Sequence, residues 1–155
     1  MVSDRVRAAV AAVRDPEISV LSIEDLGILR SVHLEQDRVV VTITPTYLGC
    51  PAMDVIRADI RAAALAAGCA DVEIVTSVSP PWTTDWLSDA ARDLLTGAGI
   101  APPAVRLLPL MPVGPSCPRC GSADSVELTR FGSTACKALW SCRSCLEPFE
   151  YMKVH

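Results

Sequence analysis

Four cysteines near the C-terminus form two pairs of the kind that bind a metal ion. Cys117 and Cys120 make the first pair, Cys142 and Cys145 make the second, and two residues separate the members of each pair. Thiols three positions apart can both point at one ion, and two such turns complete a tetrahedron. Residues 121–141 slightly exceed the usual separation of about 15 to 20 residues, which a longer hairpin loop would absorb. The sequence therefore predicts one metal site with these four ligands.

The expected ion is zinc in a structural role. A segment of about forty residues buries too little surface to fold alone, so metal binding would supply most of its folding free energy. A rubredoxin-like iron uses the same four thiolates and remains an alternative, because ligand softness does not separate iron from zinc. Four free or buried cysteines would require two such pairs to arise by chance.

A further cysteine, Cys50, lies where a predicted strand ends and a predicted helix begins. Amide N–H groups and the positive end of a helix dipole stabilise a thiolate at such a point. Gly49 removes a side chain on one flank and Pro51 fixes the backbone on the other. We expect a thiol suited to metal binding or covalent transfer. The alternative is a buried cap cysteine that acts as a small apolar side chain, and position alone does not decide between them.

Acidic residues on an upstream loop are weaker candidates. Asp15 and Glu17 flank Pro16, and Asp25 follows on the same loop. Their carboxylates could be ligands or hydrogen-bond acceptors near Cys50, although acidic residues beside a proline are commonly solvated turn formers. The sequence shows no Ser/His/Asp arrangement and no phosphate-binding glycine loop, so it gives no support to a hydrolase or a nucleotide-binding protein.

The elements that position these residues follow from hydrophobic periodicity, β-branched runs and proline or glycine boundaries. Strands 28–35 and 38–44 read as an antiparallel hairpin. The other expected elements are helices over 3–14, 51–68 and 85–96, a strand over 72–78, and a possible edge strand over 104–108. The predicted fold class is α+β: a small mixed three-stranded sheet with flanking helices, followed by a C-terminal zinc ribbon.

Prolines concentrated between residues 101 and 116 indicate a stiff connector between two domains. The predicted domains are an α+β domain over 1–100 and a four-cysteine ribbon over 117–155. The boundary is expected near Gly114.

Composition and net charge limit the classes of molecule that this chain is expected to bind. Half of the 155 residues are hydrophobic and 21% are charged, which is typical of a globular protein. A net charge of -4 argues against nonspecific binding to nucleic acid or anionic lipid, and the ribbon has only five basic residues against four acidic ones. We therefore expect protein partners, no nucleic acid and no membrane.

No signal-like or membrane-spanning run is visible, so we expect a soluble cytoplasmic protein.

Two stretches resemble the SufT-type family of iron-sulfur assembly factors. They are Asp-Pro-Glu-Ile with Ser-Ile-Glu-Asp-Leu-Gly-Ile, within 15–28, and Thr-Pro-Thr-Tyr-Leu-Gly-Cys-Pro at 44–51. With the ribbon and the Phe-Gly-Ser-Thr-Ala-Cys-Lys stretch at 131–137, the whole chain is similar to the PaaD family of phenylacetate degradation. This resemblance implies an accessory protein that helps install or maintain the iron-sulfur or diiron cofactors of phenylacetyl-CoA epoxidase subunits, without turning over substrate itself.

The resemblance also implies roles for particular residues. The family's reactive cysteine corresponds to Cys50, which would hold iron or a cluster transiently, and its acidic motif to Asp15 and Glu17, while Asp25 continues the loop motif. Ser19 stands where the family usually has a proline, a difference that affects loop stiffness more than chemistry.

Some alternatives stay open. Cys136, six residues before Cys142, could replace a ribbon ligand or contact a transferred cluster, although we treat it as a spare thiol. Cys50 could be the nucleophile of a thiol enzyme, but no base is visible beside it. The chain could also be a structural adaptor whose only metal lies in the ribbon.

Overall fold

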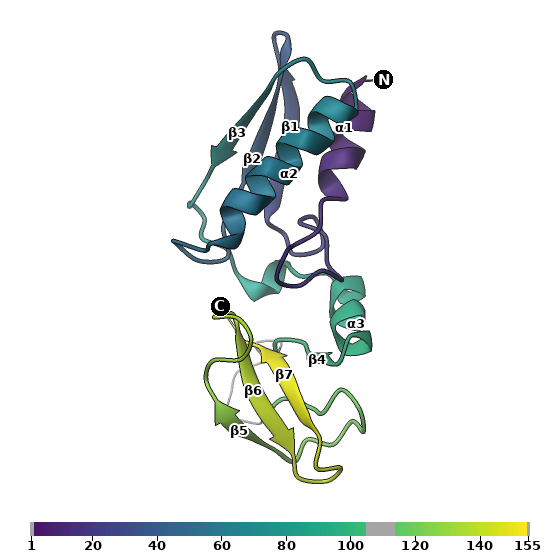
Figure 1. Ribbon diagram of the computed structural model, residues 1–155, viewed down its shortest axis with the longest axis vertical. Coiled ribbons are helices and arrows are strands. Elements are labelled where there is room, and N and C mark those ends of the chain that lie inside the picture. Colours follow the sequence, from purple (N-terminus) through teal and green to yellow (C-terminus); the bar gives the residue numbers. More distant parts are fainter. Residues whose placement is uncertain (1, 105–113, 155) are drawn as a thin grey trace. The chain divides into compact units, whose positions relative to one another are not determined.

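The computed structural model describes residues 2–104 and 114–154 (Figure 1). Its contacts divide the chain into two compact units, Met1–Ser88 and Asp89–His155. Residues 105–108 of the possible edge strand lie outside the described residues. None of the helices in the described ranges is long and apolar enough to cross a membrane.

The first unit contains a three-stranded sheet with helices on one face (Figure 1). Its strands β1 (Leu29–Glu35), β2 (Arg38–Ile43) and β3 (Val72–Thr76) lie in that order. Strands β1 and β2 are antiparallel, whereas β2 and β3 are parallel. Helices α1 (Val2–Ala11) and α2 (Ala52–Ala66) cover the sheet, and the short 3-10 helix η1 (Thr84–Trp86) follows β3. The predicted mixed sheet with flanking helices is confirmed.

Strand β2 and helix α2 form the centre of this unit. Val41 and Ile43 are fully buried on one face of β2, as the alternation in the sequence predicts. Ile56 and Ile60, four residues apart on α2, are also fully buried. Because β2 and β3 are parallel and α2 connects them, the segment that holds Cys50 leaves the sheet at the carboxyl end of its central strand.

The prediction of a single helix over 85–96 is wrong. The chain forms η1, then extends through Leu87, then forms α3 (Asp89–Gly97) in the second unit. Leu87 is buried from this extended link, with φ -67° and ψ 132°. The side chain of Thr83 caps η1 by accepting a hydrogen bond from the amide of Asp85, so the predicted cap at Thr84 is one residue late.

A tryptophan-rich segment after β3 packs on the acidic loop of the first unit. The indole Nε1 of Trp82 donates a 2.7 Å hydrogen bond to the carbonyl of Leu26. The next residue, Gly27, has φ +73°, and a Cβ added there would lie 2.8 Å from the Cβ of Trp86. Two features therefore require a glycine at position 27: its positive φ and the close approach of Trp86.

The second unit is built on a four-stranded sheet of order β4-β7-β6-β5. Its strands are β4 (Ile100–Ala101), β5 (Ser125–Thr129), β6 (Lys137–Cys142) and β7 (Pro148–Met152). Strand β6 is antiparallel to both β5 and β7, and β4 pairs with β7 in parallel. Helix α3, which falls within the domain predicted over 1–100, and strand β4 belong to this second unit.

One apolar cluster of the second unit is small and contains two of the four paired cysteines. Its buried members are Ala101, Cys117, Cys142 and Phe149, with Trp140, Cys145 and Tyr151 packed against them. The rings of Trp140 and Tyr151 meet edge to face with centroids 5.9 Å apart. These aromatic residues pack in the core beside the cysteines, and Leu95, Ala138 and Met152 add further buried apolar side chains to this unit.

We predict that Gly27→Ala destabilises the first unit more than Gly68→Ala. Gly68 also has a positive φ, +97°, but nothing lies within 4 Å of an added Cβ. The Gly68 variant should lose about 1 kcal/mol of unfolding free energy, from backbone strain alone, and the Gly27 variant about 3 kcal/mol, because the clash with Trp86 adds to it. Denaturant unfolding measures both values. Equal losses would show that the approach of Trp86 is unimportant.

Candidate functional site

Two turns with the same hydrogen-bond pattern hold the paired cysteines. In the first turn, the amide of Cys117 donates to the carbonyl of Ser122, and the amide of Gly121 donates back to the carbonyl of Cys117. In the second turn, Cys142 and Glu147 make the equivalent first bond, and Leu146 donates to Cys142. Residues 121 and 146 occupy the same place and both have positive φ, +75° and +63°. The repeated geometry points each pair of thiols in one direction.

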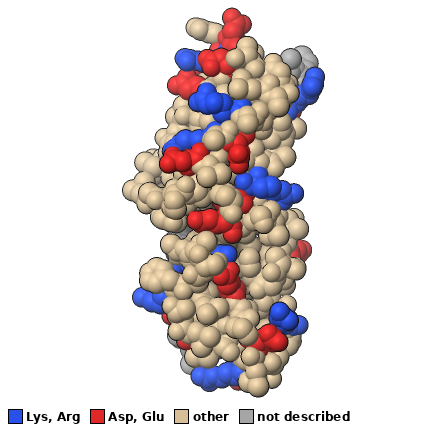
Figure 2. All heavy atoms as spheres, in the orientation of Figure 1, with Lys and Arg blue, Asp and Glu red and all other residues tan. Residues whose placement is uncertain are grey.

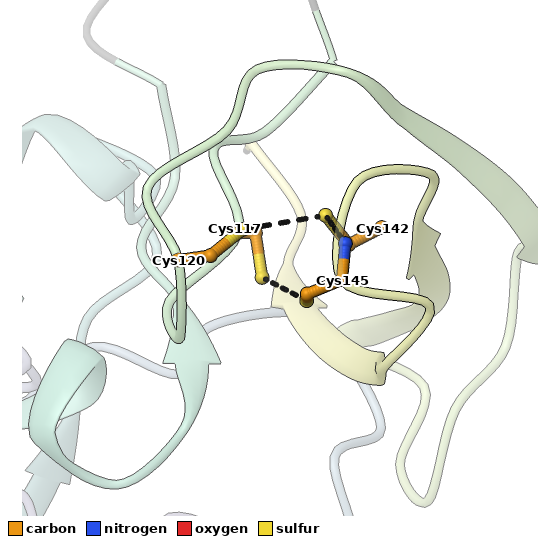
Figure 3. Close-up of side chains that lie close together, drawn as sticks. All are labelled: Cys117, Cys120, Cys142 and Cys145. Carbon is orange, nitrogen blue, oxygen red and sulfur yellow. Dashed lines mark hydrogen bonds between the residues drawn. The ribbon is translucent and has the colours of Figure 1, made fainter.

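The four sulfur atoms converge (Figure 3). All of them lie within 4.8 Å of one another. The Sγ atoms of Cys117 and Cys145 are 3.7 Å apart, and those of Cys120 and Cys142 are 3.5 Å apart. A tetrahedral ion with metal–sulfur bonds of about 2.3 Å requires sulfurs about 3.8 Å apart. The donor set therefore fits one four-coordinate metal ion.

Contacts between the turns fix their separation. The hydroxyls of Ser122 and Ser144 are 2.8 Å apart. The amide of Arg143 also donates to the carbonyl of Asp124 at 2.9 Å. The spacing of cysteines in the sequence did not reveal these contacts, because serines are common in turns for other reasons.

The thiols differ in acidity. The amide of Cys145 donates to the sulfur of Cys142 and, as the main cause, lowers the pKa of Cys142 to about 6. The pKa of Cys145 rises to about 12: the amide of Glu147 opposes this rise, but burial and the neighbouring sulfurs favour the protonated thiol. Four sulfurs this close cannot all ionise unless a cation lies among them, so metal binding must displace protons.

Cys50 lies between β2 and α2, in the position predicted. Its carbonyl accepts a hydrogen bond from the amide of Met53, and Pro51 stands at the N-cap of α2 without a side-chain cap. Gly49 has φ +80°, and Cys50 itself is half-buried. Leu48, two residues earlier, is 79% exposed. The thiol thus sits at an uncapped helix N-terminus beside an exposed apolar side chain, and its reactivity stays a prediction.

The acidic loop residues bind their own backbone. The buried carboxylate of Asp15 accepts hydrogen bonds from the amides of Glu17 and Ile18, at 2.8 and 2.7 Å. Asp25 accepts from both the amide and the hydroxyl of Ser22. These contacts give Asp15 and Asp25 a role in shaping the loop.

Among the described residues, the group of three or more side chains able to hold a metal is the ribbon cluster. Cys50, Asp15 and Glu17 do not form such a group. Cys136 is buried outside the cluster, with its sulfur 3.1 Å from the hydroxyl of Thr134. Among the described residues, Cys50 therefore belongs to no set of three or more possible metal ligands.

Comparisons with known proteins match both parts of the chain. Residues 3–76 match the model of an iron-sulfur cluster assembly protein, and residues 110–153 match the PaaD zinc beta ribbon domain. Over 147 residues the chain is 44% identical to a "Putative 1,2-phenylacetyl-CoA epoxidase" subunit of Escherichia coli (strain K12), covering 94% of this chain and 89% of that protein. The chain belongs to the PaaD family.

Other relatives of this PaaD-family chain share its first unit. The "Fe-S protein maturation auxiliary factor YitW" of Bacillus subtilis (strain 168) is 32% identical over 91 residues, which are 57% of this chain and 88% of that protein. A solved structure of "Domain of Unknown Function DUF59 from Bacillus anthracis" covers 61% of this chain and 91% of its own, with a TM-score of 0.55 and 27% identity. A second, "Conserved Hypothetical Protein TM0487 from Thermotoga maritima", has a TM-score of 0.50 and 28% identity, and covers 58% and 89%.

One side of the described surface carries charges of both signs. On the side drawn in Figure 2, Lys and Arg side chains are interspersed with Asp and Glu side chains. Exposed ion pairs such as Arg38 with Glu73, at 3.0 Å, contribute to this mixing. A mixed surface gives little attraction for a nucleic-acid backbone.

We predict that Cys142→Ser abolishes metal binding and unfolds the ribbon, because three thiolates and a hydroxyl bind a soft ion poorly and Cys142 is also a buried member of the apolar cluster. Cys136→Ser is the control, since it removes a buried thiol that lies outside the cluster. Elemental analysis should find one metal ion per chain for the wild type and the control, and much less for Cys142→Ser. Thermal unfolding of both variants gives the stability. Equal metal content in the two variants would contradict the assignment of the ligands.

Proposed function

We propose that this chain is an accessory protein of a phenylacetyl-CoA epoxidase system that helps load iron-sulfur or diiron cofactors into its partner subunits. The observation that carries the proposal is the combination, in one chain, of an iron-sulfur assembly-type domain with a PaaD ribbon. The likeness to the Escherichia coli epoxidase protein spans both parts, so it supports a place in the same system.

We infer that the ribbon ion is zinc and that its role is structural. The site is closed, because four protein sulfurs fill a tetrahedron and leave no position for a substrate. Because no coordination position is open, the ribbon would take no part in chemistry. Docking on a partner protein is the role that remains for it. Iron in the same ligands would give a coloured protein, which absorption spectroscopy detects.

Cys50 is the residue that would bind the transferred iron ion or cluster. Its thiolate would replace one ligand of an incoming iron ion or cluster, and the helix N-terminus would offset part of the negative charge. Among the described residues, Cys50 belongs to no group of three or more possible metal ligands. An incomplete set of protein ligands binds weakly, and weak binding suits a carrier that must release its cargo to a client with a full set of ligands.

A structural adaptor is the second candidate. It is favoured by the hydrogen bonds of Asp15 and Asp25 to their own loop, which give these two carboxylates a structural role. In that case the ribbon would hold the only metal of the chain. A thiol enzyme has less support, since the sequence shows no general base beside Cys50.

We predict that Cys50→Ser leaves the fold and the zinc content unchanged but reduces cofactor loading of the client subunit to the level seen without this chain. Cys69→Ser is the matched control, because it removes another thiol of the first unit whose hydrogen bond to the carbonyl of Asp71 a serine can replace. Iron and sulfide in the client, measured after anaerobic reconstitution, give the result.

Normal loading with Cys50→Ser would leave the adaptor as the better account. Rapid stoichiometric labelling of Cys50 by a thioester would instead favour the thiol enzyme.

A further inference from the structure

The loop between β5 and β6, residues 130–136, is held in one conformation by a dense set of hydrogen bonds. The amide of Gly132 donates to the carbonyl of Lys137 at 2.7 Å, and the amide of Ser133 donates to Oε1 of Glu150 at 3.0 Å. At the start of the loop, the amide of Phe131 bonds the hydroxyl of Thr129. Backbone groups along the loop are thus satisfied within the ribbon.

A buried ion pair anchors this loop. The side chain of Lys137 is only 5% exposed, and its Nζ lies 2.7 Å from Oε2 of Glu150. Burial opposes ionisation of Glu150, but Lys137 and Ser133 together keep the pKa of Glu150 below its usual value. A buried pair adds little net stability, yet it can fix one geometry. At Gly132, an added Cβ would lie 3.2 Å from Oε1 of Glu150, so the loop closes tightly on the pair.

This rigid loop presents an exposed aromatic ring. Phe131 is 66% exposed, whereas Phe149 of the same unit is 4% exposed and belongs to the core. The ammonium group of Lys153 lies 4.5 Å from the centre of the Phe131 ring and donates to the carbonyl of Arg130 at 2.9 Å. One side of the ring is therefore fixed by a cation while most of its surface remains in water.

We propose that Phe131 is the anchor by which the ribbon docks on its client, in an apolar pocket rimmed by carboxylates. Residues 128–136 contain Arg130 and no acidic residue, and Lys153 adds a second positive charge beside the ring. A partner with acidic groups around a pocket complements this charge. Because the loop is already ordered, an aromatic anchor loses little conformational entropy on binding. The identity of the client rests on the proposed function.

The test is the affinity of the full-length chain for purified phenylacetyl-CoA epoxidase subunits, measured by calorimetry. Phe131→Ala should weaken binding roughly 30-fold or more, as for an anchor at the centre of an interface. Leu34→Ala is the matched control, because Leu34 is 59% exposed and lies on β1 of the other unit. Unchanged zinc content and melting temperature would show that both variants fold.

Two further variants separate the parts of the proposal. Arg130→Glu reverses a charge beside the anchor, and its effect should shrink as salt is raised, because screening weakens exposed charge pairs. Glu150→Gln breaks the ion pair but keeps Phe131, so it should weaken binding several-fold by loosening the loop. A loss for Arg130→Glu that does not depend on salt would overturn the acidic rim. Wild-type affinity for Glu150→Gln would overturn the role of the rigid loop.

The outcomes distinguish this inference from the proposed function. Equal affinity for Phe131→Ala and wild type overturns the docking role of the ring and leaves the loading role of Cys50 standing. Weakened binding by Phe131→Ala, together with normal cofactor loading by Cys50→Ser, supports the anchor and contradicts the loading role of Cys50. If the wild-type chain binds no epoxidase subunit, both the anchor and the assigned client are wrong.

Discussion

The convergence of four cysteine sulfurs is the constraint on which the second unit depends. Two turns of identical hydrogen bonding bring Cys117, Cys120, Cys142 and Cys145 to the separations that a tetrahedral ion requires. The apolar cluster around them has Cys117 and Cys142 among its buried members. We infer that an ion bound by the four sulfurs would add folding free energy to that of the apolar core of this unit.

The two units divide the tasks of an accessory protein. In the first unit, β2 and α2 place one thiol, Cys50, at a helix N-terminus and keep it half-buried. In the second, four converging cysteine sulfurs lie beside a sheet whose loop displays Phe131. Under the proposed function, Cys50 would pass a metal on, and the four-cysteine site would keep one. This contrast explains why one chain can contain both the Cys50 thiol and the four-cysteine site.

Features encoded within a few residues were predictable, and those set by distant pairings were not. The cysteine pairs and the Gly49–Pro51 junction carry their geometry locally, so spacing and residue type sufficed. The helix over 85–96 was predicted wrongly because apolar spacing alone did not show that Leu87 packs from an extended link. The pairing of Lys137 with Glu150 depends on the register of β6 and β7, where Leu139 faces Glu150. Asp15 does form a turn, the alternative expected for an acidic residue beside a proline, but its burial could not be foreseen before the turn geometry was known.

The most direct measurement follows isotopically labelled iron from this chain to an apo epoxidase subunit under anaerobic conditions, with zinc counted in the same samples. We expect labelled iron and sulfide to accumulate in the epoxidase protein only when the chain is present, while one zinc ion stays with each chain throughout. Equal accumulation without the chain, or transfer of the ribbon metal itself, would contradict the separation of a retained structural ion from a transferred one.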